Sequence, residues 1–466
     1  MITRDRGLPI DAGLINSCIA QFNLDSARRK KLFDYYSGKH AITLRIKTKG
    51  LPNNKLVHPF PQYIATMTSG YLIGDPVQYM DSKQEKPLEV VLDAYSIADV
   101  QSIDSEIALN QSIYGRGVEL VYANSKAMPR TSAISPADSF VVYDDTVEMQ
   151  PFFGVYRLSG LNERGQPEIK RTMVYTDREI IEYKPADGMS NTEVGKEISK
   201  KLHRFGYVPM VEYWNNSIQT GDFESVLSLI DAYDTLESDR INDKEQFADA
   251  LLVLYGIAGF DNPSNPDDER TPGQRLREER TLTLPDVTAR AEYLTKALNE
   301  ADTDVLRAAL KADIHKFSMV PDLTDENFAG NSSGVAMKYK LLGLEQLTKI
   351  KERWFREGLR WRLRLFASFL ALKGAAALDP DQVSMTFKRS LPVNDVEIAS
   401  MVQTLQGLVP DSILLAQVPF VEDVNSALEE LKQQKKDSVA AQAAAFGVIP
   451  VADPKEDEEE VPKEFD

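Results

Sequence analysis

The sequence has 466 residues, 42% of them hydrophobic and 27% charged, so it can bury a sizeable core, and its length favours about two to four domain-sized units. Its formal net charge of −17 argues against tight binding of nucleic acid, which normally depends on Lys and Arg side chains that neutralise phosphates. The single cysteine excludes an intrachain disulfide. No apolar run approaches the roughly 18 residues of a membrane-spanning helix, and the N-terminus lacks the apolar core of a signal peptide. We therefore expect no membrane contact and an intracellular origin.

The first 122 residues are predicted to mix helices with short extended segments. Asp25 can cap a helix that ends at Gly38, and the next segment, AITLRIKT, alternates apolar and polar residues as a half-buried strand does. Helical spacing returns from Pro59 to Gly74 and is followed by a short extended piece, VQYM. Residues 88–122 then predict two amphipathic helices that lead into the apolar strand VELVYA.

A β-rich unit and a long polar helix follow. From Ala133 to Trp214, turn residues separate apolar runs, which predicts an antiparallel β unit. A helix of about 32 residues is predicted from residue 223, with Leu251 to Leu254 as its apolar end. Its middle, ESDRINDKEQ, is almost entirely polar, which suggests a rod that faces solvent or another subunit.

The next segment is predicted to return the chain alongside that helix. Residues 259–285 are rich in helix breakers, the piece ARAEYLTK is typical of a strand, and a second helix is predicted from Asn299 to Phe317. The two helices could form an antiparallel pair. Their connection is far longer than an ordinary helical hairpin loop, so we expect it to have a role of its own.

The C-terminal third begins with the loop NFAGNSSG at residues 327–334 and a very long helix predicted from Val335 to Leu372. One strand is expected in SMTFKRSLPVND, then shorter helices across residues 394–446, and the acidic end from Asp453, with a net charge of −6, is predicted to be disordered. Residues 338–364 carry a net charge of +6 and are interleaved with aromatic residues: Trp354, Phe355, Trp361 and Phe366. This pattern favours a packed helix whose arginines pair with neighbouring acids, or a seam between subunits, or contact with DNA phosphates.

No catalytic constellation is found in the sequence. The motifs GxxxxGK[ST] and HExxH are absent, and no strand is followed by GxGxxG. Ser332 lies in a GxSxG match, but no apolar strand precedes it and no histidine follows it. The four histidines are scattered, and an acidic loop that starts at Asp261 fails the EF-hand spacing. We therefore predict no enzyme activity, no cofactor and no metal ion.

Several local sequences occur in an order found in one family. They are YYSGKHAI (35–42), LPNNK (51–55), SGYLIGDPV (69–77), SIYGRGVELVY (112–122), VVYDD (141–145), VPMVEYWNN (208–216) and the longer segments at 228–254 and 319–347. Over roughly residues 20–440, the chain resembles the portal proteins of tailed double-stranded-DNA bacteriophages, in particular the siphophage-type family.

The resemblance implies an α+β, helix-rich fold with wing, stem, clip and crown parts, assembled as a ring around an axial channel. The parts implied here are the wing (1–221, with the long wing helix and strand at 337–393), the stem helices (222–256 and 299–320), the clip (257–298), the tunnel loop (321–336), the crown (394–446) and an acidic tail (447–466).

The same resemblance implies a function. The chain would be one subunit of a portal, or head–tail connector, which is a dodecamer in the family and lets DNA enter during packaging and leave during ejection. Its partners would be further copies of itself, the terminase large subunit, a head-completion adaptor, the major capsid and scaffolding proteins, and double-stranded DNA that passes without sequence recognition. It would lie at the portal vertex of the virion, and in the host cytoplasm during assembly.

Candidate site residues follow from this assignment. The flexible tunnel loop would contain Asn327, Gly330, Asn331, Ser332, Ser333 and Gly334. Lys338 and Lys340 come just after it and could touch DNA phosphates. Acids along the first stem helix would repel DNA or pair with a neighbouring subunit: Asp231, Asp234, Glu237, Asp239, Asp243, Glu245 and Asp249. The candidate intersubunit seam comprises Arg353, Arg356, Arg360 and Arg364.

Two alternatives stay open from the sequence. One is a metal-dependent nuclease or nucleotidyltransferase that uses Asp144 and Asp145, and DNA hydrolysis by the purified chain would favour it. The other is a structural adaptor without a channel, which the size of the oligomer would distinguish from a ring.

Overall fold

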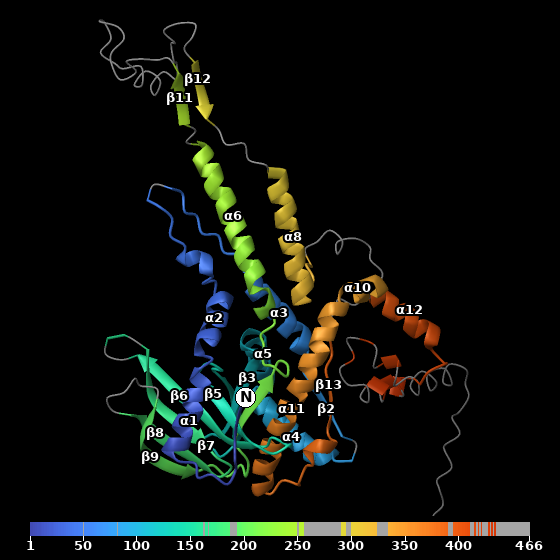
Figure 1. The fold of residues 1–466 in the computed structure, drawn as a ribbon. Helices are drawn as coiled ribbons and strands as arrows, with labels where there is room; N and C mark the ends of the chain where they lie inside the picture. The colour runs from blue at the N-terminus through green and yellow to red at the C-terminus, as the bar shows by residue number, and fades with distance from the viewer. Residues whose placement is uncertain are drawn as a thin grey trace, which may run out of the picture. The chain divides into compact units, whose positions relative to one another are not determined.

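The computed structural model describes residues 1–49, 51–81, 83–161, 164–165, 167–186, 193–248, 251–255, 290–294, 300–323, 334–389 and 395–410, with short stretches between 414 and 434. The chain divides into two compact units, Met1–Ser390 and Leu391–Asp466. The second unit contains α12 (Asp395–Leu405), and the other named helices and strands belong to the first (Figure 1). Among the described residues, no helix combines the length and the apolar character that a bilayer-spanning segment needs.

Helices and sheets both contribute to the first unit. Its helices are α1 (Ala12–Asn23), α2 (Ser26–Tyr36), α3 (Phe60–Ile73), α4 (Glu85–Ala98), α5 (Val100–Tyr114), α6 (Leu227–Ala248), α8 (Glu300–Ser318), α10 (Gly334–Lys340) and α11 (Leu342–Leu372). Short 3-10 turns are η1 (Ala41–Leu44), η2 (Glu224–Val226) and η3 (Pro380–Gln382). The mixed helix and sheet composition agrees with the predicted α+β class.

The β-rich unit predicted between residues 133 and 214 is confirmed as two packed sheets. The larger has the order β1 (Ile2–Arg4), β5 (Ser139–Asp144), β6 (Pro151–Leu161), β7 (Pro167–Tyr175), β8 (Glu179–Pro185) and β9 (Val194–Leu202). It is antiparallel except for the parallel pair β1–β5. The smaller has the order β10 (Met210–Trp214), β3 (Arg116–Ala123) and β4 (Pro129–Ile134). Val118 and Met210 of the small sheet pack against Val141 and Tyr175 of the large one.

Two further apolar clusters fix the helices on these sheets. Helix α1 covers the large sheet, because Ile15, Ile19 and Phe22 are buried against Phe140 and Phe153. The largest cluster surrounds α11, whose buried side chains pack on α3, α4, α5 and the small sheet. At the closest approach of α11 to β10, a Cβ atom at residue 358 would lie 2.4 Å from the ring of Tyr213, so only Gly358 permits this contact.

Most of the predicted elements are confirmed, and three predictions are wrong. Helix α3, helices α4 and α5, and the short strand β2 (Gln78–Met80), which pairs with β13 (Ser384–Thr386), form where the sequence predicts them. The segment AITLRIKT is not a strand, because its first half forms η1 and its second half joins no sheet of the described residues. The helix predicted from Val335 to Leu372 breaks at Leu341 into α10 and α11.

The third wrong prediction concerns the end of the long helix. Helix α6 ends at Ala248, and the leucine-rich run beyond it forms strand β11 (Leu251–Tyr255) rather than another helical turn. This strand pairs antiparallel with β12 (Arg290–Leu294), the strand predicted in ARAEYLTK. The first helix therefore has 22 residues, fewer than the roughly 32 predicted from residue 223.

Candidate functional site: the helix pair α6–α8 and its attachments

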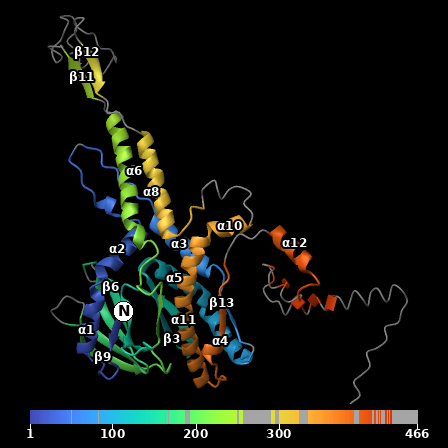
Figure 2. The ribbon, with the colours of Figure 1, turned by 45° about the vertical axis from the view of Figure 1, so that its right-hand side comes forward.

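Helices α6 and α8 lie side by side in both ribbon views (Figures 1 and 2). Arg240 contacts Asp304 at 3.1 Å, and Glu237, which precedes Arg240, contacts Arg307, which follows Asp304. The order of these pairs means that the two helices run antiparallel, as the sequence predicts. The contact between the two helices therefore includes ion pairs as well as apolar packing.

The opposite face of α6 is polar and yet buried. Asp234, Ser238 and Asn242 follow one another at four-residue spacing, which places them on one face of a helix, and each is at most 2% exposed. Their partners come from residues 40–58, which we call the strap. Ser238 Oγ accepts from the backbone N–H of Leu56 at 2.9 Å, and Asn242 Oδ1 accepts from the backbone N–H of Asn54 at 2.7 Å.

Asp234 is the centre of this attachment. His40 Nδ1 lies 2.6 Å from Asp234 Oδ2, and His58 contacts Asp234 Oδ1 through its ring at 2.9 Å and its backbone N–H at 2.8 Å. The other ring nitrogen of His40, Nε2, lies 3.0 Å from the carbonyl oxygen of Tyr35, so both ring nitrogens have a polar partner. Burial alone would raise the pKa of Asp234, but the hydrogen bonds from His40 and His58 outweigh it and lower that pKa.

We expect Asp234→Ala to loosen the strap. The variant leaves a buried imidazole and a backbone N–H without their acceptor, at a cost of about 2–3 kcal/mol in the free energy of unfolding. Amide hydrogen exchange of residues 40–58 should accelerate, whereas the exposed Glu245→Ala on the same helix should change neither quantity. Since the pKa of Asp234 is lowered from 3.8, its contribution is complete above that value and is lost only as the pH falls through the lowered pKa. Unchanged exchange in the strap would contradict this role.

The predicted channel acids occupy different environments. Asp231 accepts from the Tyr35 hydroxyl at 2.7 Å, and Asp239 contacts Arg45 at 2.9 Å and Lys47 at 2.8 Å. Asp243 is half-buried, Glu245 is exposed, and Asp249 lies outside the described residues. Asp234 is wholly buried, so it presents no charge to solvent.

Of the predicted tunnel-loop residues, Asn327, Gly330, Asn331, Ser332 and Ser333 lie outside the described residues, and Gly334 is the first residue of α10. Lys338 is exposed on this helix, and Lys340 is half-buried at its end.

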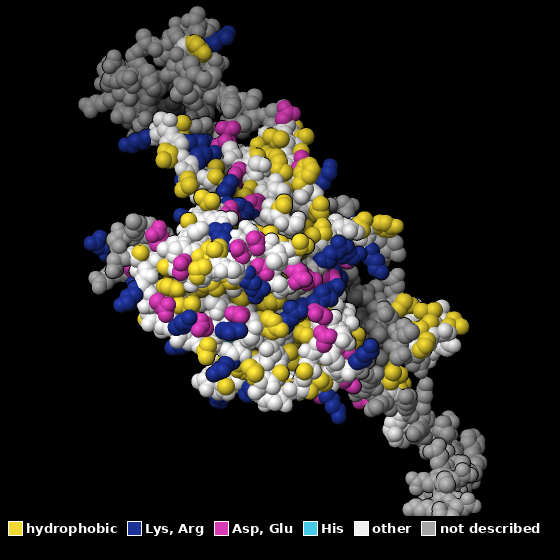
Figure 3. Space-filling model, turned by 60° about the horizontal axis from the view of Figure 1, so that its bottom comes forward, with side chains coloured by type: hydrophobic (Ala, Val, Ile, Leu, Met, Phe, Trp, Pro, Cys, Tyr) yellow, Lys and Arg dark blue, Asp and Glu magenta, His cyan; other side chains and the backbone are white. Residues whose placement is uncertain are grey.

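The four arginines of the predicted seam lie on α11. Arg356 pairs with Glu352 at 2.7 Å, Arg360 with Glu357 at 3.1 Å and Arg364 with Asp381 at 3.2 Å, while Arg353 is exposed. On the face drawn in Figure 3, basic and acidic side chains are likewise interspersed. The interleaved aromatic residues are used in packing: Phe355 and Phe366 are fully buried, Trp354 contacts Trp214 and Trp361 contacts Tyr207.

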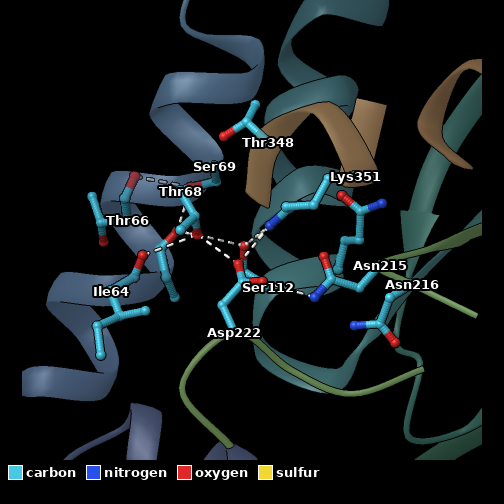
Figure 4. Close-up of polar contacts among 12 residues, drawn as sticks. Ile64, Thr66, Thr68, Ser69, Ser112, Asn215, Asn216, Asp222, Thr348 and Lys351 are labelled. Atoms are coloured by element: carbon cyan, nitrogen blue, oxygen red, sulfur yellow. Dashed lines mark hydrogen bonds and ion pairs between the residues drawn. The ribbon is translucent and has the colours of Figure 1, made fainter. Parts of the chain in front are cut away.

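Two basic residues of α11 are wholly buried, and although the sequence predicts a packed helix with arginines paired to acids, it does not single these two out. Lys351 is 0% exposed, and its ammonium lies 2.5 Å from Asp222, just before η2 and α6 (Figure 4). Asp222 also accepts from Thr68 of α3 at 2.7 Å and from Asn215 at 2.7 Å. This cluster ties α11 and α3 to the start of the α6 segment.

The second buried charge is Arg362, which is also 0% exposed. Its Nε donates to Glu119 at 2.7 Å, and its Nη1 lies 2.6 Å from Asp104. The carboxylate of Glu119 also accepts hydrogen bonds from Thr131 and Tyr213, so it has more hydrogen-bond donors than the carboxylate of Asp104. Burial raises the pKa of Asp104 to about 6 despite the nearby guanidinium.

Asp144 is the last residue of strand β5, and Asp145 follows it in a bend. Asp144 is buried, accepts from the Thr146 hydroxyl at 2.6 Å and contacts Arg6 at 3.3 Å, while Asp145 is exposed. Burial would raise the pKa of Asp144, and hydrogen bonds from Thr146 and Gln150 lower it overall. Within the described part of the chain, no three His, Cys, Asp or Glu side chains are arranged to hold a metal ion.

Comparisons with known proteins agree on one family. The family model described as "Phage portal protein, SPP1 Gp6-like" matches residues 15–441. The portal protein of Bacillus phage SPP1 is 25% identical over 412 residues, which cover 82% of this chain and 76% of the relative. The portal protein of Clostridium phage phiCD119 is 23% identical over 449 residues, which cover 90% of this chain and 95% of the relative.

Among solved structures, a chain from the neck of an empty GTA particle matches with a TM-score of 0.47 and 12% identity, covering 78% of this chain and 90% of that one. The family model spans most of the sequence and includes α6, α8 and α11. The chain therefore belongs to the SPP1 Gp6-like family of phage portal proteins.

Proposed function

We propose that copies of this chain close into a ring, dodecameric as in the family, at the portal vertex of a phage capsid, and that the paired helices α6 and α8 line the axial channel through which DNA enters and leaves. The family match carries this proposal, because it covers both helices and their attachments. A ring follows when one surface of a subunit binds a different surface of the next and the rotation closes.

The charge arrangement of the helix pair supports passage of DNA without tight binding. Asp231, Asp239 and Glu237 have hydrogen-bond or ion-pair partners within the same chain. A wall whose charges are largely neutralised in pairs offers few cationic groups to phosphates, so a duplex finds few strong binding positions. Glu245 and Asp249 stay candidates for a repulsive lining, and Lys338 and Lys340 for transient phosphate contact.

The remaining partners are proposed from family membership. Residues 257–298 would form the clip that docks the terminase large subunit during packaging and a head-completion adaptor afterwards. Residues 321–336 would form the tunnel loop, and residues 394–446 the crown. Scaffolding and major capsid proteins would contact the ring while it is built into the capsid in the host cytoplasm. The energy for translocation would come from the terminase.

Two measurements test the proposal. Negative-stain images of the purified protein should show rings with a central hole, and particles that stay monomeric or dimeric at every concentration would oppose it. Deletion of residues 330–334 should leave ring formation intact and reduce DNA packaging or retention in phage. A normal phage yield from this deletion would contradict the tunnel-loop assignment while leaving the ring untouched.

A further inference from the structure

The strap has its apolar side outward. Arg45 and Lys47 point to α6, where both contact Asp239, at 2.9 and 2.8 Å. The alternate residues Leu44 and Ile46 are consequently 81% and 90% exposed. Successive side chains of an extended segment point to opposite sides, so the salt bridges of Arg45 and Lys47 turn Ile46 toward solvent, and Leu44 at the end of η1 is exposed beside it.

Exposure of these apolar side chains to water is unfavourable for an isolated chain. Residues 45–48 belong to no sheet of the described residues, and Leu51, further along the strap, is 50% exposed. Single exposed apolar side chains are common on protein surfaces, whereas exposed apolar side chains that gather in one place mark a contact surface. The edge therefore lacks a cover within the described part of its own subunit.

A second uncovered apolar patch lies on α8. Asp304 and Arg307 of this helix pair with α6, and Ile314 is fully buried. On another face of α8, Val305 is 70% exposed, Leu306 is 50% exposed and Ala309 is exposed. Val305 and Leu306 are each surface neighbours of Ala309, at spacings of four and three.

The two patches face away from each other across α6. The strap binds the face of α6 that carries Asp234, Ser238 and Asn242, whereas α8 binds the face that carries Glu237 and Arg240. Figures 1 and 2 both show the strap, drawn in blue between α2 and α3, on one side of α6 and α8 on the other. Two different patches on opposite sides of one unit suit a head-to-tail contact between copies.

The charges beside the two patches are complementary. Lys49 and Lys55 are exposed in the strap, and Asp302 and Asp313 lie on α8 on either side of Val305 and Ala309. Opposite charges at the rim of an interface steer association and fix its register. This complementarity favours a second copy of the chain over an unrelated partner.

We propose that Leu44 and Ile46 in the strap of one subunit pack against Val305, Leu306 and Ala309 on α8 of the next subunit, and that repetition of this contact joins the helix pairs around the channel. The inference rests on the proposed ring and names the surfaces that close it. The strap is then the connection between two subunits, with its polar side on its own α6 and its apolar side on the neighbouring α8.

Cysteine cross-linking tests this contact directly. In the double variant Ile46→Cys/Ala309→Cys, mild oxidation should give a ladder of covalent oligomers up to the size of the ring on a non-reducing gel. Each single variant should stay monomeric on that gel, as should the wild type, whose Cys18 is buried. Val147→Cys/Ala309→Cys is the matched control, because Val147 is fully exposed but lies outside the strap.

The outcomes separate the two proposals. Rings in electron micrographs without a ladder would overturn the strap contact and leave the ring standing, and so would a ladder that stops at a dimer. Absence of rings from the wild type would overturn both. As a second measurement, Leu44→Ser/Ile46→Ser should lower the population of rings by about tenfold or more. It should leave the melting temperature of the monomer unchanged, because both side chains are exposed there.

Discussion

Replacement of Lys351 by Met is expected to lower the free energy of unfolding by about 3–5 kcal/mol, because it leaves the carboxylate of Asp222 buried without its cation. Both side chains are 0% exposed, so water cannot take the place of the lost ammonium. Burial disfavours the charged ammonium and lowers the pKa of Lys351, while the nearby Asp222 opposes that shift. Urea denaturation of the purified chain measures the loss.

Two variants serve as controls for that result. Lys351→Met/Asp222→Asn removes both charges and should recover most of the lost stability, since a buried pair contributes little beyond neutralising itself. Lys349→Met on the same helix breaks only an exposed contact with Glu345 at 3.5 Å and should cost less than about 0.5 kcal/mol. Equal losses from Lys349→Met and Lys351→Met would contradict the assigned role.

The effect should extend to the helix pair. Asp222 lies immediately before η2 and α6, and its backbone N–H donates to the carbonyl of Ser112 at 2.9 Å. Loss of Lys351 therefore loosens the point where α3, α5 and α11 hold the start of the segment that leads into η2 and α6. Hydrogen exchange should accelerate first in residues 222–230.

How much could be predicted from the sequence depends on the range of the interactions. Helices α3, α4 and α5 were predicted correctly because their apolar residues recur at helical spacing, a local signal. Strand β11 was missed because its pairing with β12 joins residues 35 to 43 positions apart, from Tyr255–Arg290 to Leu251–Leu294, and the leucine run Leu251–Leu254 does not reveal such a partner. The segment AITLRIKT shows the period of a strand, but a period cannot tell whether a partner strand lies beside it, and no described strand does.

The site was only partly predictable for a related reason. A polar stretch such as ESDRINDKEQ is typical of a solvated helix, and the sequence gives no sign that residues 40–58 cover one face of it. One usable signal was present: Asp234, Ser238 and Asn242 are polar residues at four-residue spacing, which places them on a single face. Lys351 and Arg362 could not be told from the surface cations of α11, because burial of a charge depends on distant partners such as Asp222 and Glu119.

Replacement of Arg362 by Met is expected to be as damaging, with a loss of about 4–5 kcal/mol at pH 7, because one guanidinium serves two buried carboxylates. The loss should be smaller at pH 5. The pKa of Asp104 is about 6 while Arg362 is present. The guanidinium of Arg362 lowers this pKa, so its removal raises the pKa further. At pH 5, Asp104 of the variant is therefore protonated in the folded state and carries no unpaired charge.

Urea denaturation of Arg362→Met at pH 5 and pH 7 measures this difference in the free energy of unfolding. The matched control is Arg364→Met, which breaks a partly exposed contact with Asp381 and should lower the free energy of unfolding only slightly at either pH. Adding Asp104→Asn to Arg362→Met should remove the difference between the two pH values, because the group that titrates is gone, but should leave the part of the loss that belongs to Glu119. If the loss were the same at pH 5 and pH 7, Asp104 would not be the carboxylate that depends on Arg362. The long helix would then be held to β3 through Glu119 alone.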